Sequence, residues 1–252
     1  MEWDWGVWHK LFGMIIALDG PSAAGKGHIG TMLATEFDLY YMQSSVVYRG
    51  LAYVCMSENM LADDSVGVVA IAETYAFEKN NHYWCTPMVP NDRHCIYASP
   101  SELATERIGE FASRISVLPA VRTLLGQVLR DFVHATPQLV MEGRDIGTAI
   151  APHADLKIFI TATPTVRAER RYKQLLSMGQ PCTLHDVRVQ LNIRDSRDES
   201  REASPLKPAH DAMVIDTSHL IPDQVVAIIK AAFIQSKLVS RVGVYAADSE
   251  GP

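Results

Sequence analysis

The seven residues from Gly20 to Lys26, GPSAAGK, constrain the fold of this chain more than any other segment. They follow a short apolar run, MIIALDG at 14–20, whose isoleucines favour a buried strand. Behind them, apolar residues recur at helical spacing as far as Phe37. In a GxxxxGK loop between a strand and a helix, backbone N–H groups and the helix N-terminus surround phosphate, and the lysine adds a mobile cation. The segment therefore predicts a loop that binds the phosphates of ATP or GTP.

Three more apolar segments have the composition of buried strands: 138–143, 156–162 and 212–217. Helical patterns lie between them, and strands that alternate with helices form a parallel sheet. The chain has 252 residues, 48% of them hydrophobic, which is enough to bury the core of one α/β unit with inserted subdomains. The expected fold is a P-loop NTPase type, a three-layer α/β/α arrangement around a central parallel sheet.

Two regions interrupt this alternation of strands and helices. The first, roughly 75–97, combines Asn and Pro turns with short aromatic runs, which predicts a small β-rich insert. The second, 181–208, is densely charged and follows Met178-Gly179-Gln180, a sequence typical of a helix end. We interpret it as a mobile, helical lid. The expected division is an N-terminal extension at 1–13, a main unit at 14–236 with an insert at about 60–115 and a lid at about 177–208, and a tail at 237–252.

Charge and composition argue against several classes of function. A net charge of −6 opposes the basic face that binding of DNA or RNA normally needs. No run of about 18 uncharged apolar residues suggests a membrane span, and residues 1–13 lack the basic start and apolar core of a signal peptide. The four cysteines, Cys55, Cys85, Cys95 and Cys182, lack a framework spacing and predict reduced thiols. We expect a cytoplasmic monomer with no nucleic-acid or membrane partner.

The amino-acid sequence of the loop indicates which class of P-loop proteins the chain resembles. After Lys26 comes Gly27, where most P-loop proteins have Ser or Thr, and GPSxAGKG resembles the nucleoside monophosphate kinases. In cytidylate kinases the loop reads GPSGAGKGT or GPSGAGKGS. This chain has Ala23 for the second glycine and His28 for the hydroxyl residue, which in the family would hydrogen-bond phosphate. The resemblance implies that ATP is bound by Gly20, Pro21, Ser22, Ala23, Ala24, Gly25, Lys26, Gly27 and His28.

The likeness to the cytidylate kinases covers roughly Ile15 to Phe233. The family segment DSGAxYR corresponds to QSSVVYR at 43–49, in which Gln43 replaces an acid and Ser45 replaces a glycine. By resemblance, Arg49 at the end of this segment binds the α-phosphate of the acceptor.

Three later segments continue the resemblance in the family order. The segment ASRISVLPAVR supplies Ser113 and Arg122 at the spacing where cytidylate kinases contact cytosine. The EGRD segment that starts at Glu142 matches the family DGRD at a strand end. RDSRDESR at 194–201 matches the lid pattern RDxxDxxR. On a helix, the two outer arginines and the central acid of this pattern would project from one face.

The resemblance implies transfer of the γ-phosphoryl group of ATP to CMP or dCMP, with Mg²⁺ as cofactor. An acid at a strand end beside a P-loop can organise Mg²⁺ and its waters, which makes Glu142 a candidate metal residue. The catalytic residues implied are Lys26, Arg144 and Arg194. The acceptor-binding residues implied are Ser44, Tyr48, Arg49, Ser113, Arg122, Arg144, Asp145, Arg194, Asp198 and Arg201.

Two other functions stay open at this point. One is a P-loop kinase of another acceptor, such as UMP or a small-molecule alcohol, against which the base-contact residues argue. The other is a nucleotide-binding protein that has lost catalysis, a reading that His28 and Gln43 suggest and the retained Lys26 opposes.

Two further groups of residues are left out of the predicted site. His82, Cys85, His94 and Cys95 have the residue types of a zinc site, but neighbours on a strand point to opposite faces, so we expect packing roles. Arg167, Arg170 and Arg171, on the helix before the lid, are expected to pair with nearby acids.

Overall fold

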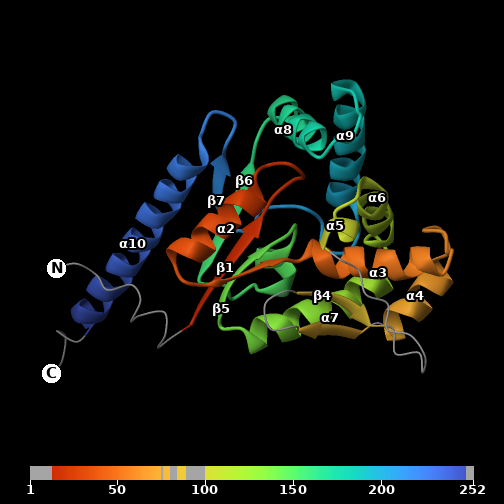
Figure 1. The fold of residues 1–252 in the computed structure, drawn as a ribbon. Helices are drawn as coiled ribbons and strands as arrows, with labels where there is room; N and C mark the ends of the chain where they lie inside the picture. The colour runs from red at the N-terminus through yellow and green to blue at the C-terminus, as the bar shows by residue number, and fades with distance from the viewer. Residues whose placement is uncertain (1–12, 75, 80–83, 89–99, 248–252) are drawn as a thin grey trace.

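The computed structural model describes residues 13–74, 76–79, 84–88 and 100–247 of the chain (Figure 1). Its centre is a five-stranded sheet in the order β2-β5-β1-β6-β7, in which all neighbouring strands are parallel. The strands are β1 Met14–Asp19, β2 Tyr40–Gln43, β5 Gln138–Glu142, β6 Leu156–Thr161 and β7 Met213–Asp216. The α/β class, the parallel sheet and the four predicted strands are confirmed.

Helices lie on both faces of this sheet (Figure 1). They are α2 Lys26–Glu36, α3 Ser45–Ser57, α4 Ser65–Thr74, α5 Pro100–Leu103, α6 Glu106–Ile115, α7 Pro119–Ala135, α8 Pro164–Ser177, α9 Leu184–Ser200 and α10 Pro222–Ala247, with a short π-helix, η1 Ile146–Ile150. None of the described helices is long and apolar enough to cross a membrane.

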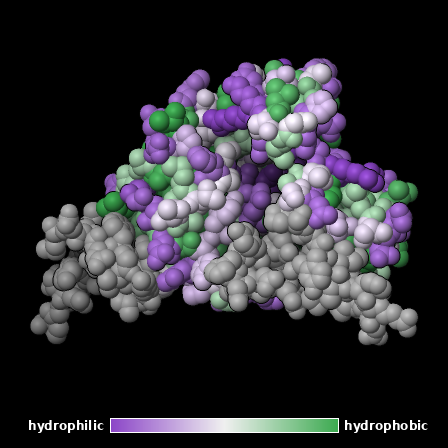
Figure 2. All heavy atoms as spheres, in the orientation of Figure 1, coloured by the Kyte–Doolittle hydropathy of each residue, from purple (hydrophilic) through white to green (hydrophobic). Residues whose placement is uncertain are grey.

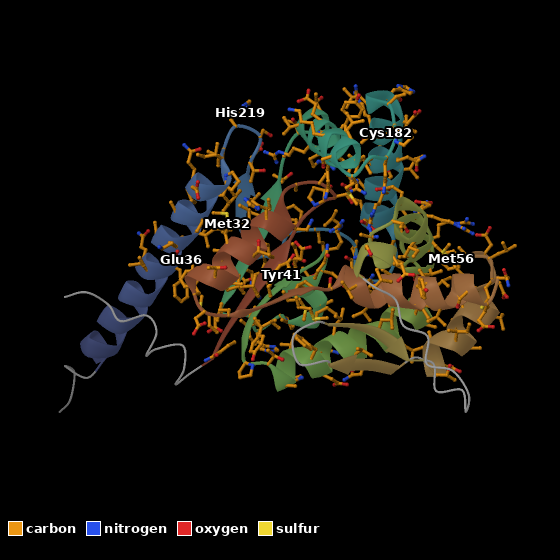
Figure 3. All side chains as sticks on the ribbon, viewed as in Figure 1. Met32, Glu36, Tyr41, Met56, Cys182 and His219 are labelled. Carbon is orange, nitrogen blue, oxygen red and sulfur yellow. The ribbon has the colours of Figure 1, made fainter. Side chains whose placement is uncertain are left out.

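The core has two layers because strand side chains alternate between the two faces of the sheet. On β1, Ile16 and Leu18 pack with residues of α2 and α10, whereas Ala17 packs with residues of α3 and α7. An ion pair between Glu36 of α2 and Lys230 of α10 joins the two helices of the first face, and Figure 3 shows Glu36 beside α10. The predicted three layers therefore form because successive side chains of each central strand point to opposite faces of the sheet, and each face is covered by helices.

Two elements were not predicted from the sequence. Strand β2 is only four residues long and forms the edge of the sheet, so half of its residues are exposed and no apolar run marks it. Its Tyr41 lies against α2, where Gly30 leaves the space: a Cβ there would approach the tyrosine ring to 2.6 Å (Figure 3). The π-helix η1 has no periodicity in the sequence that would separate it from a loop.

The region of the predicted insert contains an antiparallel pair of strands, β3 Ala76–Lys79 and β4 Trp84–Met88, together with α4, α5 and α6. The described part of 75–97, which was expected to be β-rich, contains this antiparallel pair, and the extent of the insert stays a prediction. His82, His94 and Cys95 of the rejected zinc candidate lie outside the described residues. Within the described residues, no group of three or more potential ligands gathers around a metal position. The two cysteines with described side chains, Cys55 and Cys182, are free thiols, as predicted.

The region of the predicted lid consists of the end of α8, a short connection and α9. Helix α8 stops at Ser177, and Gly179 follows with φ of 70°, as the predicted helix end requires. The side chain of Thr183 caps α9 by accepting a hydrogen bond from the Asp186 N–H at 3.1 Å. Apolar residues of the two helices pack together in a small core of their own, and Cys182 lies at their connection (Figure 3).

Gly20 is the residue that lets the phosphate loop leave β1. It has φ of 147°, and a Cβ added there would collide with the carbonyl oxygen of Ile160 in β6. We expect Gly20→Ala to lower the free energy of unfolding by about 2 kcal/mol or more, since backbone strain and overpacking act together. Gly179→Ala is the matched control, because it has φ of 70° but nothing within 4 Å of the added Cβ.

Urea unfolding of both variants tests this reading. Gly179→Ala should lose only about 1 kcal/mol, the cost of the left-handed backbone. Equal losses in the two variants would contradict the close contact with β6.

Candidate active site

A cleft of about 770 Å³ opens at the carboxyl ends of β1, β2 and β5, between the sheet and helices α6, α8 and α9. Ligands of open parallel α/β sheets bind at this edge. Figure 2 shows a hollow at the centre of the molecule with hydrophilic residues inside it. Every predicted site residue lines the cleft except Gly20, Pro21 and Ala24, which are buried. The structure therefore brings together segments that are as far apart in sequence as Ser22 and Arg201.

The loop from Gly20 to Lys26 has the backbone conformation of an anion cradle. Gly25 has φ of 98°, and Ala23 has φ of 60° although it carries a Cβ. A left-handed alanine costs about 1–2 kcal/mol, so the residue that replaces the family glycine keeps the loop shape under strain. Lys26 Nζ donates to the carbonyl oxygens of Gly20 and Pro21, each at 2.8 Å. Burial, and then the positive charge of Arg144, lower the pKa of this lysine to about 7.

Asp19, the last residue of β1, couples the phosphate loop to the segment after β5. Its carboxylate accepts hydrogen bonds from the backbone N–H groups of Ile146 and Gly147, each at 2.8 Å. Burial raises the pKa of this carboxyl to about 6. Because these N–H groups directly follow Arg144 and Asp145, Asp19 holds the backbone that presents both side chains to the cleft.

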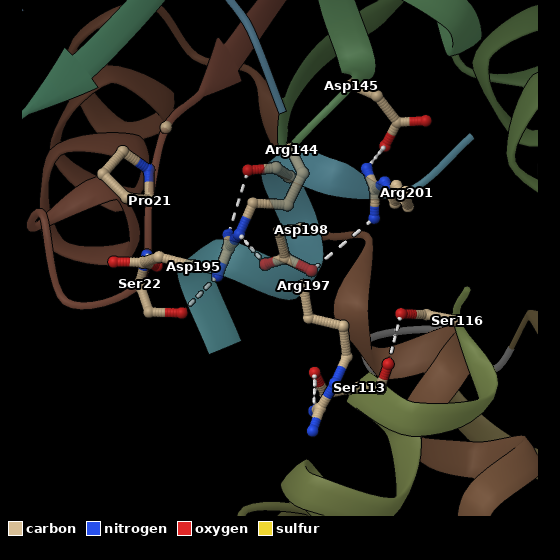
Figure 4. A network of polar contacts seen from close by, with 12 residues as sticks. Pro21, Ser22, Ser113, Ser116, Arg144, Asp145, Asp195, Arg197, Asp198 and Arg201 are labelled. Carbon is tan, nitrogen blue, oxygen red and sulfur yellow. Dashed lines mark hydrogen bonds and ion pairs between the residues drawn. The ribbon is translucent and has the colours of Figure 1, made fainter. Parts of the chain in front are cut away.

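Arg144 joins the phosphate loop to the lid (Figure 4). Its guanidinium donates to Ser22 Oγ at 2.8 Å and to Asp198 Oδ2 of α9 at 3.1 Å. Asp195, one turn earlier on α9, accepts the Ser22 N–H at 3.3 Å and pairs with Arg167. In this structure, α9 therefore lies against the phosphate loop.

Asp145 lies between two guanidinium groups. It pairs with Arg122. Its other oxygen is 3.5 Å from Arg201, which is also 3.7 Å from Asp198 (Figure 4). The Arg122 guanidinium stacks over the Tyr48 ring at 5.7 Å from its centroid. Burial raises the pKa of the Tyr48 hydroxyl to about 12, so this group is a neutral hydrogen-bonding side chain.

The helical spacing predicted that Arg194, Asp198 and Arg201 share one face of a helix, and this is wrong for Arg201. Helix α9 ends at Ser200, and Arg201 has extended backbone with ψ of 140°. Its Nε donates to the carbonyl oxygen of Ser204 at 2.6 Å, which turns the chain away from the helix axis. Arg201 still reaches the cleft with the other two side chains, because this turn directs it toward Asp145.

Arg194 and Arg49 are the more isolated positive charges of the cleft. Arg194 is partly buried, and its buried Nε has no hydrogen-bond partner among the described residues. Burial, and then the charge of Arg144, lower its pKa to about 10. Arg49 donates to the carbonyl oxygens of Leu103 and Thr105. Burial likewise lowers the pKa of Arg49 to about 10. Both groups would gain free energy from an anion placed in the cleft.

Two arginines that the sequence analysis left out also line the cleft. Arg170 donates to Thr217 Oγ1 at 3.0 Å, and Arg171 pairs with Glu106 across the cleft. The pairings of Arg167 with Asp195 and of Arg171 with Glu106 agree with the expected role of neutralising nearby acids, whereas Arg170 bonds to Thr217 instead. Their adjacent positions on α8 gave no signal that distinguished them from solvated helix charges, because their proximity to the phosphate loop depends on how α8 packs.

Glu142 provides a carboxylate suited to a divalent cation. It ends β5, lines the cleft beside Lys26, and its buried Oε2 has no hydrogen-bond partner among the described residues. Tyr41 lies next to it, and burial together with the Glu142 charge raises the pKa of that phenol. A buried oxygen without a partner is costly unless a proton donor or a cation approaches it. The residues present therefore fit Mg²⁺ carried by a nucleotide.

Comparison with known proteins decides the family. The family model described as cytidylate kinase matches residues 16–235. The chain belongs to the cytidylate kinase family. The cytidylate kinase of Rickettsia rickettsii (strain Sheila Smith) is 46% identical over 211 residues, which cover 84% of this chain and 87% of that protein. The cytidylate kinase of Rickettsia felis is 44% identical over 223 residues, covering 88% and 92%.

Among solved structures, a shikimate kinase from Acinetobacter baumannii covers 92% of this chain and 98% of its own, with 15% identity and a TM-score of 0.45. These values are too low to carry an inference. The membership of the cytidylate kinase family rests on the sequence matches alone.

Within the cytidylate kinase family pattern, two departures of this chain lie side by side. Gln43 of β2 and Glu142 of β5 are partners in the strand register. The acid missing at 43 and the longer acid at 142 therefore occupy neighbouring positions at the same sheet edge. His28, a third departure, is exposed on the first turn of α2 and lines the cleft.

Proposed function

We propose that this member of the cytidylate kinase family transfers the γ-phosphoryl group of ATP to CMP or dCMP. The observation that carries the proposal is a single cleft with two different ends. At one end lies the phosphate loop with Lys26, and at the other lie Arg122 and Asp145, a donor and an acceptor suited to the edge of a base.

ATP would occupy the loop from Gly20 to His28. The N–H groups of the loop and the N-terminus of α2 would bind its phosphates. Lys26 would exchange its bonds to Gly20 and Pro21 for bonds to phosphate oxygens, which lowers the cost of its burial. Arg170 and Arg171 of α8 supply further positive charge on this side.

The acceptor would bind between α3, α6 and the segment after β5. Arg49 and Arg144 would hold its phosphate, with Ser44 and Tyr48 beside it, as the family resemblance implies. The base would lie against Ser113, Arg122 and Asp145. The lid would contribute Arg194, Asp198 and Arg201.

No general base is required for this transfer. The acceptor phosphate has a second pKa of about 6, so it is largely dianionic at neutral pH and already nucleophilic. Catalysis then consists of placing its oxygen in line with the γ-phosphorus and neutralising charge during transfer. Lys26, Arg144 and Arg194 are the groups placed for this role.

Mg²⁺ bound with ATP would neutralise charge on the phosphates. Glu142 is the residue that would hold it, directly or through water. The negative charge of Glu142 also acts to raise the pKa of Lys26, and it thereby opposes the lowering of this pKa by burial.

We further propose that the lid at about 177–208 closes over bound nucleotide and that the insert at about 60–115 binds the acceptor. Two contacts of α9 support this proposal: Asp195 accepts the Ser22 N–H of the phosphate loop, and Asp198 accepts a hydrogen bond from Arg144. Exclusion of water at this stage would suppress hydrolysis of ATP. The monomeric state and the cytoplasmic location stay predictions.

One assay tests the proposed function directly. ADP production from Mg²⁺-ATP is measured with CMP, dCMP, UMP, AMP and shikimate as acceptors. We expect turnover with CMP or dCMP to exceed that with the others by at least about tenfold in kcat/KM. Preference for another acceptor would assign a different kinase activity, and binding of ATP without turnover would indicate a protein that has lost catalysis.

Asp145 is expected to select cytosine over uracil. Cytosine has an exocyclic amine where uracil has a carbonyl oxygen, and a carboxylate accepts hydrogen bonds but donates none. In Asp145→Asn the amide can donate to the uracil oxygen, so the CMP to UMP ratio of kcat/KM should fall by about tenfold, or about 1.4 kcal/mol. Asp131→Asn, an exposed position on α7, is the control and should leave the ratio unchanged.

A second outcome is informative for Asp145→Asn, because this residue also neutralises Arg122 and Arg201. If both activities drop together at a constant ratio, Asp145 acts by arranging the arginines, and base selection belongs to other residues.

His28 is expected to assist ATP binding. It lines the cleft from the first turn of α2, where a donated hydrogen bond to phosphate contributes about 1.5–3 kcal/mol. His28→Ala should therefore raise the Kd for ATP by about tenfold or more, and His28→Thr should largely preserve it. Calorimetric titration with Mg²⁺-ATP measures both. Unchanged affinity in His28→Ala would remove the proposed contact.

A further inference from the structure

We infer that Arg197 is a positioning residue for recognition of the acceptor base, acting from the lid through Ser113. This inference rests on the proposed function, in which Ser113 contacts the base. Arg197 occupies an unspecified position of the lid pattern RDxxDxxR and is not among the residues that line the cleft. It would act by holding Ser113 from the side opposite the base.

The contacts join two elements that are distant in sequence. Arg197 Nη1, on α9, donates to Ser113 Oγ of α6 at 2.8 Å (Figure 4). The same guanidinium donates to both carboxylate oxygens of Glu110, one turn earlier on α6, at 3.0 and 3.3 Å. Glu110 thus neutralises and orients Arg197, and Arg197 in turn approaches the Ser113 hydroxyl in one geometry.

The hydroxyl of Ser113 is left with a defined direction. A serine hydroxyl has one proton to donate and two lone pairs, and Arg197 occupies one of the lone pairs. Ser116 Oγ donates to the backbone carbonyl of Ser113 at 2.9 Å and not to its hydroxyl. No described residue accepts the Ser113 proton. Ser113 is 4% exposed and lines the cleft, so its remaining hydrogen-bonding capacity is available to a base there.

The hydrogen bond from Arg197 to Ser113 contributes more free energy than the ion pair between Arg197 and Glu110. The side chains of Glu110 and Arg197 are 45% and 22% exposed, and ion pairs of this kind contribute little. A charged donor to a buried hydroxyl is stronger and more directional. The bond exists only while α9 lies beside α6. Lid position and the orientation of a base-contacting side chain are therefore coupled through Arg197.

The main test is Arg197→Met, which keeps a similar length but removes every donor. We expect the KM for CMP to rise by about tenfold, as loss of a charge-assisted hydrogen bond predicts, with the KM for ATP changed less than about twofold. Arg188→Met is the matched control, because Arg188 is an exposed arginine of the same helix. Arg197→Lys, which retains a donor, should recover part of the loss.

A double-mutant cycle separates a role through Ser113 from a general effect on folding. In a Ser113→Ala background, Arg197→Met should raise the KM for CMP no further, since the mediating hydroxyl is gone. Multiplicative effects of the two substitutions would overturn the inference, and so would equal rises in the KM for CMP and ATP. If the wild-type protein does not phosphorylate CMP, the proposed function itself is wrong. The proposed role of Arg197 in acceptor recognition is then wrong as well.

Discussion

Repulsion between clustered guanidinium groups is the constraint on which the site depends. Arg49, Arg122, Arg144, Arg170, Arg171, Arg194 and Arg201 all line one cleft together with Lys26. Buried like charges are tolerated only when carboxylates or anions lie among them. Asp145 and Asp198 perform this role for the groups nearest to them. Arg194 and Lys26 keep lowered pKa values, and this residual positive field is what a nucleotide phosphate would neutralise.

The position of this charge cluster follows from the parallel sheet. Because β1, β2 and β5 all end at one edge, the phosphate loop, Ser44 and the segment from Glu142 to Asp145 meet there. Asp19 then fixes the last of these segments to the first by its two backbone hydrogen bonds. The lid adds its own charges from the opposite side through Arg144 and Asp198. Affinity for an anion is thus arranged by backbone topology before any substrate is present.

Local sequence predicted those parts of the site whose geometry is local. The strand, loop and helix around Lys26 were predicted correctly because their hydrophobic periods and the glycines specify the backbone within a few residues. The edge strand β2 was missed because half-exposed residues carry no such period. Arg201 was assigned to a helix face because spacing alone does not show where a helix ends.

The sequence by itself determined the family, the parallel α/β class and the residue types of the site, since these depend on motif spelling and on periodicity. Only the tertiary structure decided which charges are paired. Arg170, Arg171 and Arg197 have the same local sequence character as solvated helix arginines. Packing of α8 and α9 nevertheless places two of them in the cleft and the third on Ser113. Partners of this kind come from segments up to 87 residues away, and no local pattern encodes a distance between them.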